Sequence, residues 1–397
     1  MPTAQTTGKP SIVIVGGCGH VGLPLGMAFA REGHSVSLYD ISTKSVEMVN
    51  AGVMPFDENG APELLKQVRA TGLLTATTDA QAIGKAEAVI VTIGTPVDEY
   101  LDPSVSSFDS SLNAVASSMR SGQLLVLRST VFPGVTERLG RQVAAMGIGE
   151  IDVAYCPERI VQGESLAELA QLPQLIAGCT EQASKRAAEL FASISPSTIF
   201  LRPIEAELSK LYANAWRYIN FAISNQFWVM AEEFGADFAK IHEALRRDYP
   251  RMKSFARAGF AAGPCLLKDT MQLGAFNHGS FVLGQAAMMI NEGLPYLWVQ
   301  RIKQTHDLQH MTVGVLGMAF KPNSDDARSS LSYKLRKVLQ LEAKQVLCTD
   351  PYVRDPSLTP LEDVLAQADL LVVGTPHDVY KSMSFRQPVM DISGVLN

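Results

Sequence analysis

Over the first 200 residues, short apolar runs rich in β-branched residues alternate with amphipathic stretches. The runs are Ser11–Gly17, Ser35–Asp40, Ala86–Pro96, Gln123–Thr130 and Asp152–Glu158. This rhythm is typical of successive βαβ units and predicts a parallel, doubly wound sheet. Most runs are apolar on both faces, as expected for a sheet that helices cover on two sides. We therefore expect an α/β domain over residues 1–200.

The periodicity changes to helical in the middle of the chain. From Glu205 to about Arg247, apolar side chains recur at three and four residues, with Gly235 as a predicted break. Residues 201–305 are expected to form an all-α region with one long helix. A helix of that length usually crosses between domains or packs against a partner subunit. This helix is therefore expected either to cross between domains or to contact a partner subunit in a homodimer or higher homo-oligomer.

The strand rhythm returns at Met311 and continues through two further apolar runs before the chain ends. Residues 306–397 are therefore expected to form a second, smaller α/β domain. Its segments GVLGMAF and TPH weakly repeat VGGCGHVG and GTP of the first domain, which indicates a distant internal repeat. The predicted fold class is α/β: a Rossmann-like parallel sheet, a central all-α dimerisation region and a smaller Rossmann-like C-terminal domain.

Composition indicates a globular enzyme. The 397 residues are 47% hydrophobic and 19% charged, and the formal net charge is −6. Such a chain repels nucleic acid, so an anionic ligand must be held by locally placed cations and backbone N–H groups. The start lacks the pattern of a signal peptide, and the longest apolar runs are too short to span a membrane. We expect a cytoplasmic protein with neither nucleic acid nor membrane as a partner.

The chain carries no sign of a metal site or a disulfide framework. Its five cysteines are widely spaced, odd in number and without a C-x-x-C pair. His306 and His310 have the spacing of a helical metal pair, but no H-E-x-x-H signature or third ligand accompanies them. We interpret the cysteines as reduced thiols and the two histidines as a solvated helix end.

A dinucleotide-binding motif follows the first predicted strand. Gly17, Gly19 and Gly22 form G-x-G-x-x-G directly after Ile12–Val15, and a helix is expected from Leu23 to about Arg31. Glycines allow a tight turn and close backbone approach to a pyrophosphate, whose charge faces the helix N-terminus. The loop also contains His20 and Val21, which we count as cofactor-binding through their position. The side chain of His20 receives no role of its own.

Asp40 ends the next predicted strand, 18 residues after Gly22. A carboxylate there would accept hydrogen bonds from the ribose hydroxyls and repel a 2′-phosphate. The motif therefore predicts NAD, rather than NADP, as the cofactor. The alternative is a cluster of glycines that serves helix packing, with Asp40 as a turn residue.

Cys265 lies after a loop of small residues and just before a predicted helix, in the segment Ala258–Asp269. A helix N-terminus lowers the pKa of a thiol, and small neighbours such as Gly263 leave room for a substrate. Buried, unreactive cysteines are common, so this segment alone leaves a structural role open.

Seven ordered motifs resemble the UDP-glucose/GDP-mannose dehydrogenase family over nearly the whole chain. They are GGCGHVGLPLGMAFA, GTPVDE, RSTVFPGVTE, YCPERIVQGES, AELSKLYANAWR, GPCLLKD and GMAFKPNSDDARSS. The resemblance implies an NAD-dependent oxidation of a nucleotide-linked sugar C6 alcohol to a uronate, with four electrons passed to two NAD. A second hydride can leave only from a tetrahedral carbon, so a thiolate from Cys265 would add to the aldehyde and later release the acid from a thioester.

The resemblance also implies roles for the residues near the reacting carbon. Lys210 and Asn214, four apart on the predicted helix, would both face the developing oxyanion. Thr130 would position the base or the hydrolytic water, and Asp269, four residues after Cys265, would assist that water and the lysine. Thr95, at the GTP strand end, and Thr130 would also border the cofactor.

Substrate contacts follow from the same resemblance. The predicted substrate-binding residues are Glu158, Arg159, Lys210, Asn214, Arg251, Gly263, Lys321 and Arg328. Two cations, Lys321 and Arg328, would neutralise the diphosphate. Arg251 matches an arginine that reaches across the dimer to substrate. For each arginine a surface ion pair is the alternative.

The chain departs from the family pattern at two places. Gln162 stands where several UDP-glucose-oxidising relatives carry a glutamate base, and a neutral amide cannot take a proton. The base would then be Lys210, water bound to Thr130, or Asp269. In the cysteine loop, Ala262 and Pro264 replace more permissive residues. The Pro-Glu-Arg form at Arg159 favours a UDP-N-acetylhexosamine, of the manno or gluco series, over UDP-glucose.

Three other functions remain open on the sequence: a UDP-glucose 6-dehydrogenase, a two-electron hydroxyacid dehydrogenase, and a non-catalytic NAD-binding regulatory protein. A hydroxyacid dehydrogenase needs neither a nucleophilic cysteine nor a second α/β domain. The regulatory alternative rests on Gln162 and on the altered cysteine loop.

Overall fold

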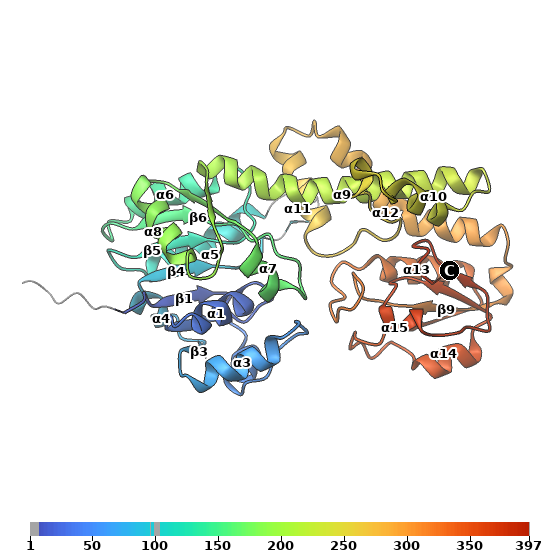
Figure 1. Ribbon diagram of the computed structural model, residues 1–397, viewed down its shortest axis with the longest axis horizontal. Coiled ribbons are helices and arrows are strands. Elements are labelled where there is room, and N and C mark those ends of the chain that lie inside the picture. Colours follow the sequence, from blue (N-terminus) through green and yellow to red (C-terminus); the bar gives the residue numbers. More distant parts are fainter. Residues whose placement is uncertain (1–7, 96, 99–103, 397) are drawn as a thin grey trace, which may run out of the picture. The chain divides into compact units, whose positions relative to one another are not determined.

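The computed structural model describes residues 8–95, 97–98 and 104–396 (Figure 1). The GTPVDE motif lies partly outside this range, at Pro96 and Glu99. The chain forms two compact units, Met1–Leu211 and Tyr212–Asn397. Among the described residues, no helix combines the length and apolar character needed to cross a membrane.

The first unit is built on an eight-stranded sheet in the order β3-β2-β1-β4-β5-β6-β7-β8. Its strands are β1 (Ile12–Val15), β2 (Val36–Tyr39), β3 (Leu74–Thr77), β4 (Ala88–Val91), β5 (Leu124–Leu127), β6 (Asp152–Tyr155), β7 (Gln174–Gly178) and β8 (Thr198–Phe200). All neighbours pair in parallel except β6 and β7, which are antiparallel. The first six strands thus form the doubly wound sheet that the sequence predicts.

Helices cover both faces of this sheet, because alternate residues of its central strands enter two different cores (Figure 1). Ile12 and Ile14 pack with α1 (Gly22–Arg31), α2 (Thr43–Asn50), α3 (Ala61–Ala70), α7 (Ser165–Gln171) and α8 (Glu181–Phe191). Val13 and Val15 pack with α4 (Gln81–Lys85), α5 (Val105–Ser117) and α6 (Val135–Ala145). The prediction of strands that are apolar on both faces is confirmed.

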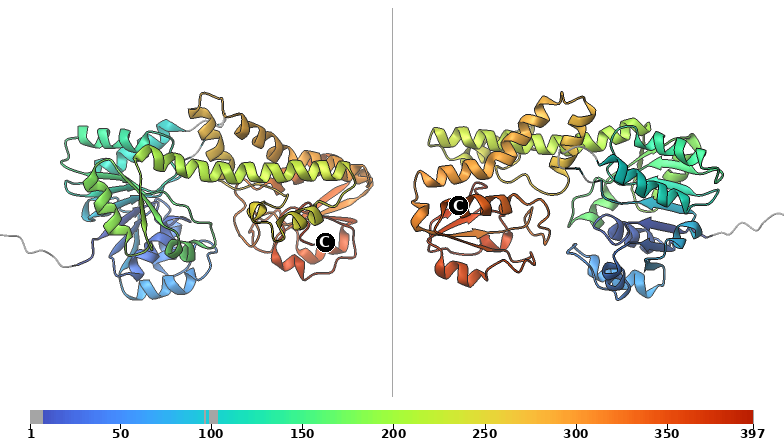
Figure 2. Two further views of the ribbon diagram at one scale, coloured as in Figure 1. Left: turned by 45° about the horizontal axis from the view of Figure 1, so that its top comes forward. Right: turned by 180° about the vertical axis from the view of Figure 1, so that it is seen from behind.

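The long central helix is α9 (Pro203–Glu233), drawn in Figure 2 as one continuous helix. The helix ends at Glu233, next to the break predicted at Gly235. Gly235 has a φ of +62°, a left-handed conformation that glycine adopts without strain and that does not continue a helix. Asp237 then caps α10 (Phe238–Arg246) by accepting hydrogen bonds from the backbone N–H groups of Ala239 and Lys240.

The second unit joins helices to a four-stranded parallel sheet in the order β10-β9-β11-β12. Its helices after α10 are η1 (Pro250–Met252), α11 (Leu266–Phe276), α12 (Val282–Lys303), η2 (Leu308–His310), α13 (Leu331–Glu342), α14 (Leu361–Gln367) and α15 (Asp378–Lys381). Its strands are β9 (Thr312–Leu316), β10 (Gln345–Thr349), β11 (Leu370–Val373) and β12 (Val389–Met390). One core contains side chains of α9, α10, α12 and this sheet together.

The predicted fold class is therefore confirmed: a larger sheet comes first, helices follow, and a smaller parallel sheet ends the chain. The second strand series begins at Thr312, next to the predicted start at Met311. The finer division into domains at residues 200 and 305 stays a prediction.

Candidate active site

The glycine motif forms the turn between β1 and α1. A Cβ on Gly17 would lie 2.7 Å from the carbonyl oxygen of Ile14, and one on Gly22 would lie 2.6 Å from that of Gly16. Both positions therefore require glycine for packing. A Cβ on Gly19 would meet nothing closer than 3.5 Å, so the backbone there is open to a ligand. The loop thus has the shape that a pyrophosphate at a helix N-terminus needs.

Asp40 lies directly after β2, beside this loop. Its Oδ2 accepts a 3.0 Å hydrogen bond from the backbone N–H of Cys18, and its Oδ1 accepts one of 3.0 Å from Ser42. The carboxylate is thereby fixed at the loop with lone pairs left for a ribose diol. Together with the open backbone at Gly19, it fits NAD. The ring of His20 packs 4.0 Å from that of Phe56, Val21 immediately precedes α1, and Thr95 is buried after β4.

Thr130 follows the carboxyl end of β5, next to a buried ion pair. Arg128 is 1% exposed, and its guanidinium donates to the carboxylate of Glu158 and, at 3.1 Å, to the carbonyl of Cys156. Glu158 also accepts hydrogen bonds from the backbone N–H groups of Arg159, at 2.7 Å, and Ile160, at 2.8 Å. These contacts make Glu158 a support for its loop. The sequence does not predict that Arg128 is buried, because the burial of this charge depends on its ion pair with Glu158, 30 residues later.

The remaining predicted residues of the first unit lie on the same loop or on α9. Arg159 is partly buried, its guanidinium donates to the carbonyl of Pro173, and burial lowers its pKa. Gln162 is half-buried, and Glu58 holds the following segment by accepting hydrogen bonds from Gly163 and Ser165. Lys210 lies half-buried on α9.

Cys265 is the N-cap residue of α11 and is exposed, as the sequence predicts for a reactive thiol. Burial raises the pKa of Cys18, Cys156 and Cys348 to about 12, which keeps these thiols protonated. Burial likewise raises the pKa of Cys179 to about 11. Cys179 is exposed as well, but of the five cysteines only Cys265 is the N-cap residue of a helix.

Asp269 lies one turn into α11 and is completely buried. Its carboxylate accepts a 2.5 Å hydrogen bond from the side-chain amide of Asn214 and forms an ion pair with Lys268. A buried carboxylate needs such partners, since an unpaired one would cost several kcal/mol. The structure therefore joins Asp269 to Asn214 of α9, and Asp269 lies one turn after Cys265 on α11, while the catalytic roles of the three residues stay a prediction.

A row of polar side chains on α9 holds the segment that leads to Cys265. Asn220 donates to the carbonyl of Ser254 at 2.7 Å, and Ser224 donates to that of Ala256 at 2.7 Å. Asn225 accepts a 2.8 Å hydrogen bond from the N–H of Gly259. This row fixes a loop that lacks regular structure. Sequence reasoning missed it, although the polar residues at helical spacing were a usable signal.

The cysteine loop contacts the C-terminal segment 320–328, the predicted diphosphate loop. Gly263 has a φ of +104°, a Cβ on it would lie 2.6 Å from the ring of Phe320, and its N–H donates to the carbonyl of Ser329 at 3.3 Å. Arg328 bonds both carboxylate oxygens of Asp326. The hydrogen bonds to Asp326 raise the pKa of Arg328. Lys321 lies on the same loop, half-buried.

Arg251 lies in η1, exposed, with its guanidinium 4.7 Å from the ring centre of Tyr249. His306 and His310 follow α12, and His310 bonds Asp307 at 2.8 Å. In the described part of the chain, no three His, Cys, Asp or Glu side chains gather in a way that could hold a metal ion.

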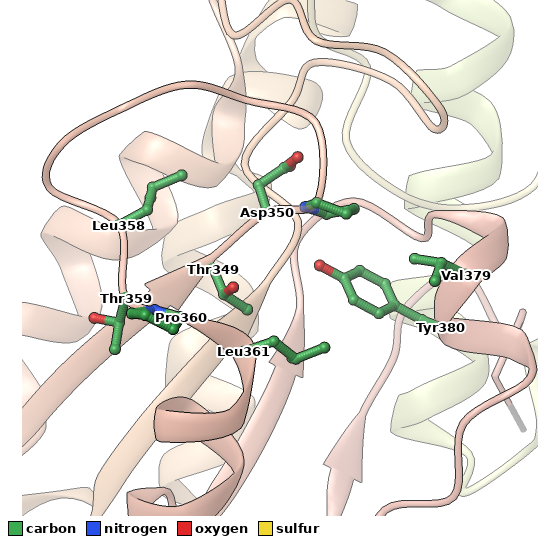
Figure 3. Close-up of a pocket in the computed structure, with 9 residues that line it drawn as sticks. Thr349, Asp350, Leu358, Thr359, Pro360, Leu361, Val379 and Tyr380 are labelled. Atoms are coloured by element: carbon green, nitrogen blue, oxygen red, sulfur yellow. The ribbon is translucent and has the colours of Figure 1, made fainter.

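Two surface pockets of the second unit lie away from the predicted residues. The pocket in Figure 3, of about 300 Å³, opens at the end of β10, and the side chain of Tyr380 points toward Thr349 across it. The other, of about 330 Å³, is lined by His242, Glu243, Arg246, Arg247 and Arg257. None of the predicted site residues lines either pocket.

Comparison with family models matches three segments of the chain. Residues 11–195 match the NAD-binding domain of the UDP-glucose/GDP-mannose dehydrogenase family, residues 204–292 its central domain, and residues 314–397 its UDP-binding domain.

Individual relatives match over nearly the full length. The UDP-N-acetyl-D-mannosamine dehydrogenase of Pyrococcus horikoshii is 32% identical, over 94% of this chain and 91% of the relative. The UDP-N-acetyl-D-mannosamine dehydrogenase of Salmonella typhimurium is 26% identical, over 96% of this chain and 97% of the relative. The solved structure of the UDP-D-ManNAc dehydrogenase of P. horikoshii has a TM-score of 0.90 at 29% identity and covers 98% of this chain and 96% of that one. The UDP-glucose dehydrogenase of Pyrobaculum islandicum has a TM-score of 0.91 at 27% identity and covers 100% and 96%.

These matches agree with the geometry of the glycine loop and with the order of elements in both units. They exclude a hydroxyacid dehydrogenase, because the matching family acts on nucleotide sugars. The chain belongs to the UDP-glucose/GDP-mannose dehydrogenase family and is an NAD-dependent nucleotide-sugar dehydrogenase.

Proposed function

We propose that this enzyme oxidises the C6 alcohol of a UDP-N-acetylhexosamine, of the manno or gluco series, to the uronate, with Cys265 as the nucleophile. The observation that carries the proposal is an exposed thiol at the N-terminus of α11, one turn from the buried Asp269–Asn214 pair. The curated relatives support the sugar, since those of P. horikoshii and S. typhimurium are named UDP-N-acetyl-D-mannosamine dehydrogenases.

The loop Gly17–Gly22 and Asp40 would hold NAD, which when bound would supply the hydride acceptor, and each sugar would require two NAD. The alcohol first loses a hydride and a proton and becomes an aldehyde. The sulfur of Cys265 adds to the aldehyde carbon, which becomes tetrahedral and again bears a hydrogen that can leave as hydride. Loss of that hydride and of the hydroxyl proton converts the adduct to a thioester, and hydrolysis of the thioester by water releases the acid and restores the thiol.

The other residues that the sequence assigns to the reaction receive matching roles. Asn214 and Lys210 would stabilise the oxyanion that forms at the sugar C6 oxygen. Asp269 would orient the water that attacks the thioester, and Thr130 would position the base or that water. Because Gln162 cannot act as a base, proton removal falls to Lys210, to water at Thr130, or to Asp269.

Recognition of the UDP moiety falls to the loop 320–328. Lys321 and Arg328 would face the diphosphate, with Arg328 already oriented by its bidentate contact with Asp326. Glu158 and Arg159 would hold the loop beside the sugar, and Gly263 leaves space next to the thiol. Arg251 would reach the substrate of the partner subunit.

The last role requires a homodimer, and α9 offers a surface for one. Six large apolar side chains along it and directly after its end are at least 40% exposed: Tyr212, Trp216, Ile223, Phe227, Met230 and, one residue past the helix, Phe234. Their spacing of four, seven, four, three and four residues places them on one face of the helix. A continuous exposed apolar stripe is typical of a subunit interface. We propose that two copies of α9 pair through this face.

The second candidate substrate is UDP-glucose, favoured by the likeness to the P. islandicum enzyme. The test is a panel of UDP- and GDP-sugars, with NADH measured by absorbance and the product by mass spectrometry. We expect two NADH per molecule of uronate from a UDP-N-acetylhexosamine. One NADH per sugar would contradict the four-electron scheme, and a faster reaction with UDP-glucose would favour the second candidate. NAD binding without turnover of any sugar would favour the regulatory function.

Cys265→Ser isolates the proposed nucleophile. We expect this variant to form no uronate and at most slowly to interconvert alcohol and aldehyde, because a hydroxyl at this position is a far weaker nucleophile. Cys179→Ser is the matched control and should keep the wild-type rate. Uronate formation by Cys265→Ser at the wild-type rate would show that the thiol is not the nucleophile.

A further inference from the structure

A buried histidine lies between β10 and the predicted diphosphate loop. His377, the last residue of the segment that joins β11 to α15, has no solvent exposure. Its Nδ1 is 2.9 Å from the backbone nitrogen of Asn323, and its Nε2 is 2.9 Å from Oδ2 of Asp350. A backbone N–H can only donate, so Nδ1 accepts and Nε2 carries the hydrogen that Asp350 accepts. Both ring nitrogens are therefore used.

Asp350 anchors this histidine to the sheet. Its Oδ2 also accepts from the N–H groups of Met318, at 2.6 Å, and Ala319, at 2.9 Å, just after β9. Its Oδ1 accepts from Tyr352 at 2.8 Å and Val353 at 2.9 Å, after β10. With four backbone donors at the ends of two strands, the carboxylate has little freedom to move. The imidazole bonded to it is correspondingly fixed.

Asn323 is the part of the loop that the histidine contacts. It has a φ of +54°, which asparagine tolerates better than most residues. Its side chain forms a reciprocal pair with Asp378: Nδ2 donates to Oδ2 at 2.6 Å, and Oδ1 accepts from the backbone N–H at 3.0 Å. Three hydrogen bonds thus hold the loop at one residue. The one that Asn323 donates to His377 is partly buried, and the other two are exposed.

Asn323 lies between the two cationic residues of the loop. Lys321 is two residues before Asn323, and Arg328 is five residues after it. The N–H of Phe320 donates to the carbonyl of Asp326 at 2.9 Å and closes the loop, and the ring of Phe320 lies against Gly263. A shift at Asn323 would therefore move the groups that face the diphosphate.

We propose that His377, fixed by Asp350, is a positioning residue that sets the loop 320–328 for binding the diphosphate of the substrate. The inference rests on the proposed function, which assigns Lys321 and Arg328 to that diphosphate. His377 itself does not touch the reacting carbon in this scheme. A substitution of His377 should therefore change the affinity for the UDP-sugar and leave the rate of the chemical steps unchanged.

Two substitutions separate the two hydrogen bonds. In His377→Asn, the side-chain oxygen can occupy the place of Nδ1 and still accept from Asn323. In His377→Gln, the longer side chain can reach Asp350 as Nε2 does, but it leaves the N–H of Asn323 without an acceptor. We expect His377→Gln to raise the KM for the UDP-sugar and the Kd for UDP about tenfold, the usual effect of one lost hydrogen bond. Its kcat and its KM for NAD should stay within about twofold, and His377→Asn should keep the KM within about threefold.

His34→Gln is the matched control. His34 is 3% exposed, lies in the first unit, and also uses both ring nitrogens, toward Pro10 and Ser193. It should lose stability but keep the KM for the UDP-sugar. Asn323→Gly provides a second variant that does not disturb the core. It keeps the N–H for His377 but removes the pair with Asp378, and a rise of a few-fold in KM is expected.

Three results would overturn the inference. One is a KM and a UDP affinity for His377→Gln equal to those of His34→Gln. Another is a parallel loss of kcat and NAD affinity, which would indicate a purely structural role. The third, which holds even if His377→Gln does not fold, is a tenfold or larger rise of KM in Asn323→Gly, because that variant keeps the hydrogen bond to His377 and loses only the pair with Asp378. Failure of the proposed function is distinguishable, because the wild-type enzyme would then neither bind UDP nor oxidise any UDP-sugar.

Discussion

The side-chain amide of Asn214 donates a 2.5 Å hydrogen bond to the carboxylate of Asp269, which is fully buried one turn after Cys265. The two residues are 55 positions apart, on α9 and α11. Their contact means that the helix carrying Asn214 and the helix carrying the thiol support each other. A change in either residue should therefore be felt at the thiol.

Asp269→Asn tests the role of the carboxylate in thioester hydrolysis. The amide keeps the shape but cannot orient water as a carboxylate does, and we expect uronate release to slow by about 10²- to 10⁴-fold. A sugar adduct on Cys265 should then accumulate, detectable by intact-protein mass spectrometry. Lys268 also loses its partner, at a cost of up to about 3 kcal/mol of stability.

The control for this variant is Asp307→Asn, which removes an exposed carboxylate of the same unit. It should behave as the wild type in rate and in thermal stability. If Asp269→Asn released uronate at the wild-type rate and showed no adduct, Asp269 would have no part in hydrolysis.

Gly263→Ala should damage the cysteine loop in two ways. The φ of +104° is unfavourable for alanine, and the added Cβ would lie 2.6 Å from the Phe320 ring. We expect a loss of at least about 1 kcal/mol of stability and a raised KM for the UDP-sugar. Gly279→Ala is the matched control, since Gly279 has a φ of +71° but nothing within 4 Å. Equal effects of the two substitutions on KM would mean that the contact between the loops is unimportant.

Phe227→Glu tests the proposed subunit interface. Phe227 lies in the middle of the exposed apolar stripe of α9, and a buried, unpaired carboxylate would oppose association. Light scattering coupled to size exclusion should show half the wild-type mass. Leu341→Glu, at an 84% exposed residue of α13, should leave the mass unchanged. A wild-type protein that already elutes as a monomer would contradict the interface.

The ionisation of Asp350 should contribute to the pH dependence of the free energy of unfolding. Burial alone would raise its pKa, but hydrogen bonds from His377 and the backbone N–H groups outweigh burial and lower it from 3.8 to about 2. The folded protein therefore holds this carboxyl ionised where the unfolded chain protonates it. Its contribution, about 2 kcal/mol, is present above pH 3.8 and is lost as the pH falls toward 2.

Tryptophan fluorescence during urea unfolding can follow this contribution. All three tryptophans, Trp216, Trp228 and Trp298, lie in the second unit, as Asp350 does. Asp350→Asn should be less stable at neutral pH and should lose less stability on acidification than the wild type. An identical acid profile for the variant would show that Asp350 is not the group responsible.

The sequence predicts those features that depend on local pattern. Strand β1 and the break at Gly235 follow from the apolar periodicity and from a single glycine. The position of Cys265 at the start of α11 follows from the small residues before it. These signals lie within about ten residues of the feature, so one sequence is sufficient to detect them.

Other features depend on partners far apart in the chain. The antiparallel pairing of β7 with β6 is absent from the apolar pattern, because a buried strand looks alike in either direction. Arg128 is paired with a glutamate 30 residues away, and His377 with an aspartate 27 residues away. The residues next to Arg128 and His377 in the sequence do not distinguish these two side chains from exposed polar ones.

The backbone N–H groups of Met318 and Ala319 follow β9 as that of Cys18 follows β1. In the first unit, Asp40 accepts from one such group and the loop stays open at Gly19. In the second unit, the side chain of Asp350 engages both groups, so no phosphate can take them without displacing it. Although the chain contains two sheets of related design, we therefore expect only the first to bind a dinucleotide, and a titration with NAD should give one molecule bound per polypeptide.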